Sequence, residues 1–144
     1  MAGECLCFSA RRTSRALTRL YDDALRPLGI QASQLSVLNA IALVGEREAV
    51  MGLLSDALAM DRTTLSRNIR PLEKAGLVRI APSPADARAR MVRLTSKGER
   101  ILAEALPLWK SANARVVAAL GAESAAALRG QLDTAVAAVS AAHR

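Results

Sequence analysis

Basic and hydroxyl side chains are concentrated in one segment of this chain, between Asp61 and Arg93. The segment carries eight positive and three negative side chains, and its net charge of +5 is most of the +7 of the 144-residue chain. Hydroxyl groups and guanidinium forks bind phosphates and base edges, although they also occur on solvated surfaces without a partner. A charge concentrated in this way favours a polyanion partner. The candidate contact residues are Arg62, Thr63, Thr64, Ser66, Arg67, Arg70, Arg88 and Arg90.

The two cysteines of the chain, Cys5 and Cys7, form a second group of reactive side chains. A Cys-x-Cys pair on a helix points its thiols about 200° apart, so a disulfide within the pair would be strained. The pair also lacks further metal ligands, because the only histidine, His143, lies at the other end of the chain. We therefore expect no metal site within one chain, while a thiophilic ion shared by two chains stays open. Arg11, one helical turn after Cys7, could favour its thiolate form.

The sequence contains no recognisable set of catalytic residues. There is no Ser–His–Asp set, no glycine-rich phosphate loop and no carboxylate cluster, and the adjacent Asp22 and Asp23 cannot converge on one atom. We predict no catalytic residues, no cofactor and no enzyme activity. A thiol-dependent peroxidase or a metal carrier that uses the two cysteines is the rival from another functional class.

The segment Arg62–Ala75 is predicted to form the helix that carries most of these side chains. Leu65, Ile69 and Leu72 recur in it at helical spacing, which predicts one buried stripe. The hydroxyl and guanidinium groups then lie on the other faces, where they are free to meet a partner. A short polar and basic helix of this kind suits the reading of a DNA groove.

The neighbouring segments predict a helix–turn–helix followed by a hairpin. Asp61 is placed to cap the helix by accepting backbone N–H bonds, and Gly76 is placed to end it. A shorter helix at 53–59 precedes the turn. After the glycine, segments 77–81 and 91–95 alternate like strands around a loop whose prolines and Asp favour turns. The stretch 45–52 could add one short strand to this hairpin.

Four further helices are expected on either side of this unit, at 6–25, from an N-cap at Ser33 to Gly45, at 96–120 and at 123–141. The first and the last two carry more apolar surface than one small domain needs. We interpret them as a subunit interface, the alternative being an ordinary intramolecular bundle. No internal repeat, low-complexity tract or linker divides the chain.

Composition narrows the class of protein. Apolar residues make up 51% of the chain, yet it has one Phe, one Trp and one Tyr, so the core must be aliphatic and built from closely packed helices. No run approaches ~18 consecutive apolar residues, which excludes a membrane-spanning helix. The start shows no basic-then-apolar signal segment, and we expect a cytoplasmic protein that does not bind membranes.

Two stretches, SDALAMDRTTLSRNIRPLEKAGLV and ADARARMVRLTSKG, resemble the MarR family of winged helix–turn–helix repressors. The resemblance implies a mainly α fold with a small β-wing and a single domain over 1–144. Residues 31–96 would be the DNA-binding region, and 1–30 and 97–144 the dimerisation helices. In that family the helix that corresponds to 62–75 enters the major groove and the wing reaches the minor groove. The matching contacts would be Thr63, Thr64, Ser66, Arg67 and Arg70 in the helix, and Arg88 at the wing tip.

The segment Leu-Cys-Phe near the first helix resembles the organic hydroperoxide resistance regulators, a peroxide-sensing branch of that family. The resemblance implies that Cys7 is oxidised to a sulfenic acid and that Tyr21 hydrogen-bonds and activates it. Two other tyrosines of that branch are replaced here, by Arg11 and Ala32. Cys5 of the same or another subunit, or a small thiol, could then react with the oxidised cysteine. The alternatives are a small buried thiol with no chemical role, a pocket for small aromatic acids that is typical of the family, and no ligand at all.

From these residues we predict a homodimeric regulator of transcription that represses a palindromic operator on double-stranded DNA. Oxidation of Cys7, or binding of a small molecule, would change the separation of the two DNA-reading helices. The regulator would then dissociate from its operator. An architectural protein that binds DNA without sequence preference is the second rival.

Overall fold

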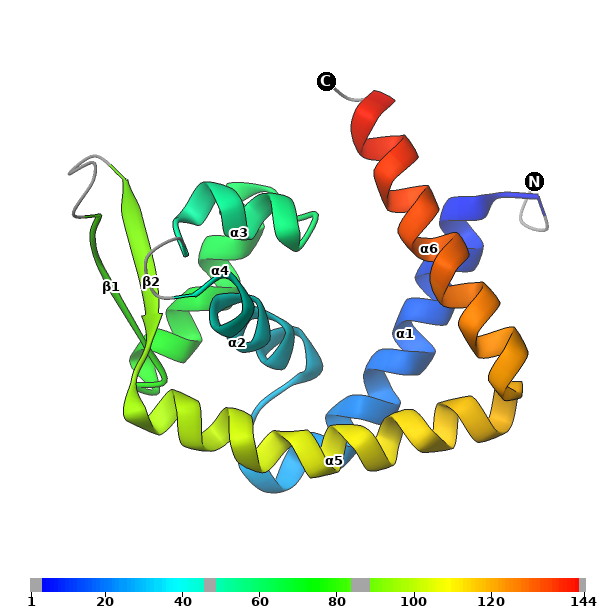
Figure 1. The fold of residues 1–144 in the computed structure, drawn as a ribbon, viewed down its shortest axis with the longest axis horizontal. Coiled ribbons are helices and arrows are strands. Elements are labelled where there is room, and N and C mark those ends of the chain that lie inside the picture. The colour runs from blue at the N-terminus through cyan, green and yellow to red at the C-terminus, as the bar shows by residue number, and fades with distance from the viewer. Residues whose placement is uncertain (1–3, 46–48, 84–88, 143–144) are drawn as a thin grey trace.

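The computed structural model describes residues 4–45, 49–83 and 89–142 of the chain. In these residues the chain is mainly helical, as predicted, with one small antiparallel sheet (Figure 1). The elements in chain order are α1 (Leu6–Leu25), a 3₁₀ turn η1 (Arg26–Leu28), α2 (Ala32–Val44), α3 (Met51–Ala57), α4 (Arg62–Lys74), β1 (Val78–Pro82), β2 (Arg90–Leu94), α5 (Ser96–Leu120) and α6 (Ala122–Ala142).

The long helix α5 joins two lobes, one at each of its ends (Figure 1). Helices α2, α3 and α4 and the two strands gather at its beginning, and they form the first lobe. The second lobe consists of α6, which rises from the end of α5, and the first half of α1. The first lobe contains the larger buried core, in which the predicted stripe of Leu65, Ile69 and Leu72 is buried as expected. Helix α2 contributes Val37, Leu38, Ala40 and Ile41 to this core.

Both ends of α4 form as the sequence predicts. The Asp61 carboxylate accepts a hydrogen bond from the Thr64 backbone N–H at 2.8 Å, which satisfies one of the free donors at the helix start. After the helix, Gly76 has a φ of 70°, which is a left-handed backbone conformation. Glycine adopts it at a lower free energy than a residue with a Cβ atom does.

The predicted cap of the second helix was wrong. The N-cap of α2 is Gln31, and Ser33 lies inside the first turn. Two other side chains accept hydrogen bonds from the backbone N–H groups at the start of α2. The Gln34 amide oxygen accepts from the Gln31 N–H at 2.9 Å, and the Asp22 carboxylate accepts from the Ala32 N–H at 2.7 Å. The carboxylate of Asp22 comes from α1, and only the folded chain brings it to this helix end.

Strands β1 and β2 pair antiparallel, with Val78 opposite Leu94 and Pro82 opposite Arg90. A short third segment joins β2 on its other edge, since the Val92 backbone N–H donates to the Ala49 carbonyl at 2.9 Å. This is the single-strand extension expected between residues 45 and 52. The hairpin loop at 84–88, which includes the candidate Arg88, lies outside the described residues.

The start of α5 is bonded to the end of α4. Thr95 is the N-cap of α5 and accepts the Gly98 backbone N–H at 3.1 Å, while its hydroxyl donates to the Gly76 carbonyl at 2.7 Å. The Lys97 ammonium group donates to the Ala75 carbonyl at 2.9 Å. These bonds satisfy carbonyls at the end of α4 and hold one end of α5 against it.

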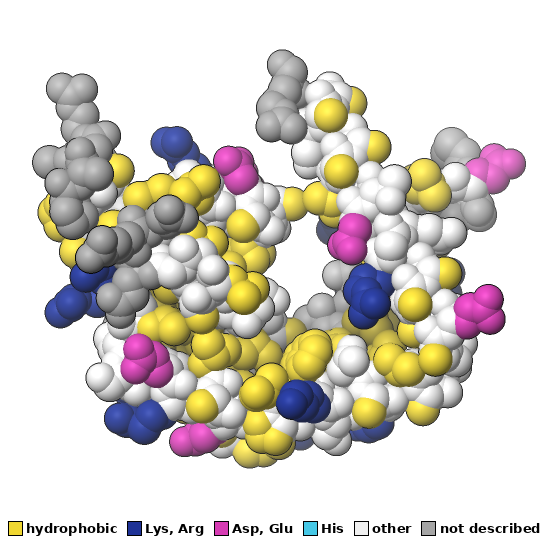
Figure 2. Space-filling model, viewed as in Figure 1, with side chains coloured by type: hydrophobic (Ala, Val, Ile, Leu, Met, Phe, Trp, Pro, Cys, Tyr) yellow, Lys and Arg dark blue, Asp and Glu magenta, His cyan; other side chains and the backbone are white. Residues whose placement is uncertain are grey.

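Helix α6 has no buried residue in the described chain. Its Leu132, Val136 and Val139 are 43%, 52% and 58% exposed. On the face that Figure 2 shows, hydrophobic side chains lie along α6 and at its junction with α5. No single described helix is long and apolar enough to cross a membrane. Only the bent pair Leu6–Leu28 and Ala32–Val44 meets the length and composition criteria together, across a 77° bend.

Replacing Gly98 by alanine is expected to destabilise the protein, because the added Cβ atom would lie 2.0 Å from the Leu77 carbonyl oxygen. Overpacking against backbone lowers the free energy of unfolding by about 1–3 kcal/mol. Gly130→Ala on α6 is the matched control, since a Cβ atom added there would meet no other atom within 4 Å and alanine favours a helix. Thermal melts of both variants test this contact, and equal melting temperatures would contradict it.

Candidate nucleic-acid interface

Helix α4 exposes a continuous polar and basic surface opposite its buried stripe. Arg62, Thr63, Arg67 and Arg70 are exposed, and Ser66 is half-buried. Leu65, Ile69 and Leu72 hold the helix against the core of the first lobe, so its outer face is presented by a fixed scaffold.

The hydroxyl groups on this surface differ in what they can still bond. The Thr64 hydroxyl donates to the Asp61 carboxylate at 2.6 Å, and the Ser66 hydroxyl donates to the Arg62 carbonyl at 2.8 Å. Each of these hydroxyls has one proton, so both can accept from a base edge but cannot donate to a phosphate without breaking the local bond. Thr63 makes no such bond among the described residues and is the hydroxyl that is free to donate.

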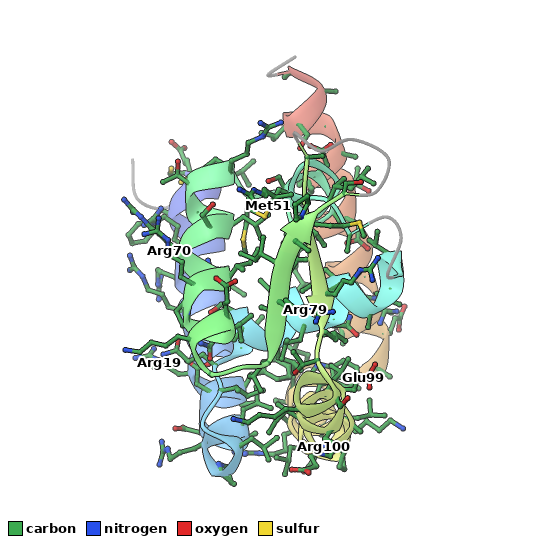
Figure 3. The ribbon with its side chains drawn as sticks, turned by 90° about the vertical axis from the view of Figure 1, so that its left-hand side faces the viewer. Arg19, Met51, Arg70, Arg79, Glu99 and Arg100 are labelled. Carbon is green, nitrogen blue, oxygen red and sulfur yellow. The ribbon has the colours of Figure 1, made fainter. Side chains whose placement is uncertain are left out.

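The guanidinium groups of Arg67 and Arg70 form no ion pair within the described residues, where the one salt bridge joins Arg26 to Asp23. Figure 3 shows Arg70 extending outward from α4, on the side away from the sheet. Free, exposed guanidinium forks on a short helix can contact guanine edges or backbone phosphates.

The hairpin adds further basic side chains to the lobe. Arg90 is exposed at the start of β2, next to the loop that holds Arg88. Arg79 lies directly opposite Arg93 in the register of the two strands. Like charges at opposite positions destabilise a sheet, and an anionic partner would relieve the repulsion. From the sequence Arg79 and Arg93 counted as charges but could not be placed together, because their pairing depends on the strand register.

The two thiols lie at the start of α1, far from this surface along the chain. Cys5 is the N-cap residue of α1, and Cys5 and Cys7 are both exposed free thiols. Their exposure contradicts the alternative that Cys7 is a buried apolar side chain in the single chain. Arg11, one turn after Cys7, is exposed as well.

Tyr21 does not contact Cys7 within one chain. Fourteen residues of helix separate them by about 21 Å. The Tyr21 hydroxyl instead donates to the Asn113 side-chain carbonyl on α5 at 3.0 Å, and burial raises the pKa of this phenol above its ordinary 10.0. A tyrosine could reach the thiol only from a second copy of the chain.

A cavity of about 850 Å³ lies between the end of α1, α2 and α5. Its lining is mainly apolar and includes Leu102 and Trp109, with Asn39 and the phenol of Tyr21 as polar groups. Glu99 is the one ionisable carboxylate among the lining residues, which contain no Lys, Arg or His. The sequence suggested a pocket only by resemblance and could not place it, since its walls come from α1, α2, β2 and α5, which are distant in the chain. Among the described residues, no three His, Cys, Asp or Glu side chains are grouped as a metal site.

Comparisons with known proteins agree with this geometry. The model of the MarR family matches residues 28–89. The transcriptional regulator HosA of Escherichia coli O111:H- is 38% identical over 90 residues, which are 62% of this chain and 65% of HosA, so the chain matches just under two thirds of that relative. The transcriptional regulator MosR of M. tuberculosis, solved in complex with DNA, superposes with a TM-score of 0.87 at 35% identity and covers 98% of this chain and 100% of its own. A variant of MarR from E. coli complexed with operator DNA has a TM-score of 0.78 at 27% identity and covers 90% and 92%.

The Asp61 cap is expected to stabilise α4 in a pH-dependent way. Hydrogen bonds from the Thr64 hydroxyl and from the Thr64 backbone N–H hold the pKa of Asp61 below its ordinary 3.8. Because the folded-state pKa is lowered, this stabilisation is present above pH 3.8 and is lost as the pH falls through the folded-state pKa. Asp61→Ala should therefore melt below the wild type at neutral pH, with a difference that shrinks in acid.

Asp61→Asn is the control for this titration, because an amide oxygen also caps a helix but does not titrate. The melting temperature of Asp61→Asn should stay above that of Asp61→Ala in acid. Melting curves across the acid range measure both differences, and a gap between wild type and Asp61→Ala that does not change with pH would rule out the linkage.

Proposed function

We propose that this chain, which belongs to the MarR family, is a sequence-specific DNA-binding regulator of transcription that acts as a homodimeric repressor in the cytoplasm. The observation that carries the proposal is the outer face of α4, with Thr63, Arg67 and Arg70 exposed and free of ion pairs on a fixed scaffold. The same fold in MosR and MarR has been solved with DNA bound, which supports this assignment.

In this proposal α4 enters the major groove and the hairpin reaches the neighbouring minor groove. Arg67 and Arg70 contact guanine edges or phosphates, and the Thr63 hydroxyl donates to a phosphate. Arg90 and the adjacent Arg88 would enter the minor groove, where a narrow groove strengthens the negative potential. Thr64 and Ser66 act mainly as acceptors, because their protons are used locally.

The apolar surface of the second lobe supports a homodimer. Leu6 is 87% exposed at the start of α1, Leu120 is 44% exposed at the end of α5, and no residue of α6 is fully buried in the described chain. Burying such a surface against a second copy is favourable by roughly 25 cal/mol per Å². Two copies related by a dyad would read two half-sites about one helical turn apart, which requires a palindromic operator.

The exposed thiols support oxidation as the signal that releases the operator. In this step the Cys7 thiolate attacks one oxygen of an organic hydroperoxide, the O–O bond breaks, and an alcohol leaves after protonation. The sulfur is oxidised by two electrons to a sulfenic acid. Cys5 of either chain can then condense with it to a disulfide and release water. Arg11 lies one helical turn after Cys7 and is exposed, and Tyr21 could act only from the partner chain.

The cavity beside Tyr21 supports a second kind of signal, a small-molecule ligand. Its apolar walls suit an apolar molecule. Glu99 is the one carboxylate among lining residues that include no Lys, Arg or His, and it disfavours the aromatic acids considered from the sequence. A neutral or cationic ligand fits this lining better. Trp109 is the only tryptophan of the chain and lines the cavity, so its fluorescence reports binding there directly.

Arg67→Ala and Arg70→Ala are each expected to weaken operator binding about tenfold or more, since a bidentate base contact or a phosphate contact contributes about 1–3 kcal/mol. The variant that loses a base contact should also lose sequence preference. Arg100→Ala, a charge-matched change on α5 (Figure 3), is the control and should bind normally. Footprinting followed by titration measures this, and protection without a discrete palindrome would favour an architectural DNA-binding protein instead.

Treatment with an organic hydroperoxide is expected to weaken operator binding by wild type about tenfold or more, while Cys7→Ser keeps its affinity. Titrations before and after treatment measure the change, and mass spectrometry should find one added oxygen atom or a disulfide in the wild type. Turnover of many peroxide equivalents per chain would favour a peroxidase.

Equal insensitivity of both proteins would reject the thiol switch and leave the repressor in place. In that case, release of the operator by a neutral or cationic apolar ligand that quenches Trp109 would assign the signal to the cavity.

A further inference from the structure

Helix α1 carries a stripe of exposed arginines that the proposed reading of DNA by α4 and the hairpin does not use. Arg11, Arg15 and Arg19 follow one another at intervals of four residues and are all exposed, so they lie on one face of the helix. The opposite face carries Leu17 and Leu20, which are half-buried. We call Arg11, Arg15 and Arg19 the α1 arginine stripe.

The charge of this stripe is not neutralised within the described chain. The two acidic side chains of α1 are engaged elsewhere, since Asp22 accepts a backbone N–H at the start of α2 and Asp23 pairs with Arg26. Arg12, at the edge of the stripe, lies over the Phe8 ring at 5.6 Å. Three adjacent guanidinium groups therefore remain free to bind an anion.

The stripe also contains a hollow with the right groups to bind a phosphate. Ser14, Arg15, Thr18 and Arg19 line a shallow depression of about 300 Å³ on α1. Two hydroxyl groups and two guanidinium forks that face one depression are the side chains that commonly contact the oxygens of a nucleic-acid backbone. No base-reading role follows, because the depression is lined by side chains of a single helix that stands apart from α4.

The stripe points to the same side of the molecule as the outer face of α4. In Figure 3 both Arg19 and Arg70 extend toward the left of the view, away from the sheet and from α5. Arg11 and Arg15 share the face of Arg19. Along the helix axis the stripe spans about 12 Å, the length of roughly three to four base pairs of duplex.

We propose that the α1 arginine stripe is a second contact surface for the DNA backbone, which binds phosphates of the operator outside the grooves that α4 and the hairpin read. This inference rests on the proposed function and adds to it the residues that bind the backbone. A membrane surface fits less well, because the apolar side of α1 is half-buried against the rest of the protein. Such contacts strengthen binding to operator and to unrelated DNA alike and carry no sequence information.

The salt dependence of binding tests this proposal. For Arg15→Gln/Arg19→Gln, the slope of log affinity against log salt should fall by about 2 to 4 for a dimer, since each lost phosphate contact removes about 0.9. Affinity for operator and for random duplex should fall by the same factor, about tenfold or more, so that the specificity ratio is unchanged. Arg100→Gln controls for the loss of a surface arginine away from the stripe, one charge per chain instead of two, and should keep the wild-type slope.

The charge-retaining variant Arg15→Lys/Arg19→Lys should recover most of the slope. An unchanged slope in the glutamine variant overturns the proposal and leaves the stripe to an acidic protein or another partner. Loss of the dimer in that variant, measured by solution mass, would place the stripe in the subunit interface and also overturn it. If the wild type itself protects no discrete site, the proposed function fails instead, and the two failures are thereby distinguished.

Discussion

The bonding of α5 to the end of α4 is the contact on which the rest of this structure depends. Thr95 and Lys97 bond the carbonyls of Gly76 and Ala75, directly after α4, and Gly98 lets the α5 backbone approach Leu77 so closely that no side chain fits between them. The helix that carries the apolar lobe is thereby bonded to the segment that ends the helix facing DNA. Because bonded and closely packed segments move together, a shift of α5 is expected to be passed to α4 through this segment. This gives a physical route from a signal at the second lobe to the spacing of two DNA-reading helices.

The proposed roles divide the arginines of the chain between two kinds of contact. Those on α4 lie on a helix narrow enough to enter a groove, held by Leu65, Ile69 and Leu72 from behind. Those on α1 lie on a helix whose apolar side faces the rest of the protein, and they form a linear charged surface. Reading bases requires the first arrangement, whereas binding phosphates requires only charge at the right spacing. The arginines of α1 therefore increase the affinity for DNA of any sequence, and they leave the choice of base sequence to the arginines of α4.

Several features of the candidate site could be predicted from local sequence because they depend on residues a few positions apart. The cap at Asp61, the buried stripe of α4 and the glycine stop at Gly76 are of this kind. The Ser33 cap failed because Asp22 and Gln34 bond the same helix start, and Asp22 reaches it only after α1 and α2 have packed. The pairing of Tyr21 with Cys7, suggested by resemblance, could not be judged from spacing in the sequence. Within one chain the two residues lie about 21 Å apart, because each of the fourteen helical residues between them adds about 1.5 Å along the axis.

By itself the sequence determined the succession of helices and strands, the position of the groove-reading helix and the concentration of positive charge. These follow from hydrophobic period, capping residues and charge counts, all of which act over short distances along the chain. Only the tertiary structure decided the cavity beside Glu99 and Trp109, the bond from Tyr21 to Asn113, and the opposition of Arg79 and Arg93. It also showed Arg19 of α1 on the same side as Arg70 (Figure 3). The physical reason is that these arrangements join segments distant in the chain, and their geometry is set by packing between elements rather than by the preferences of any one of them.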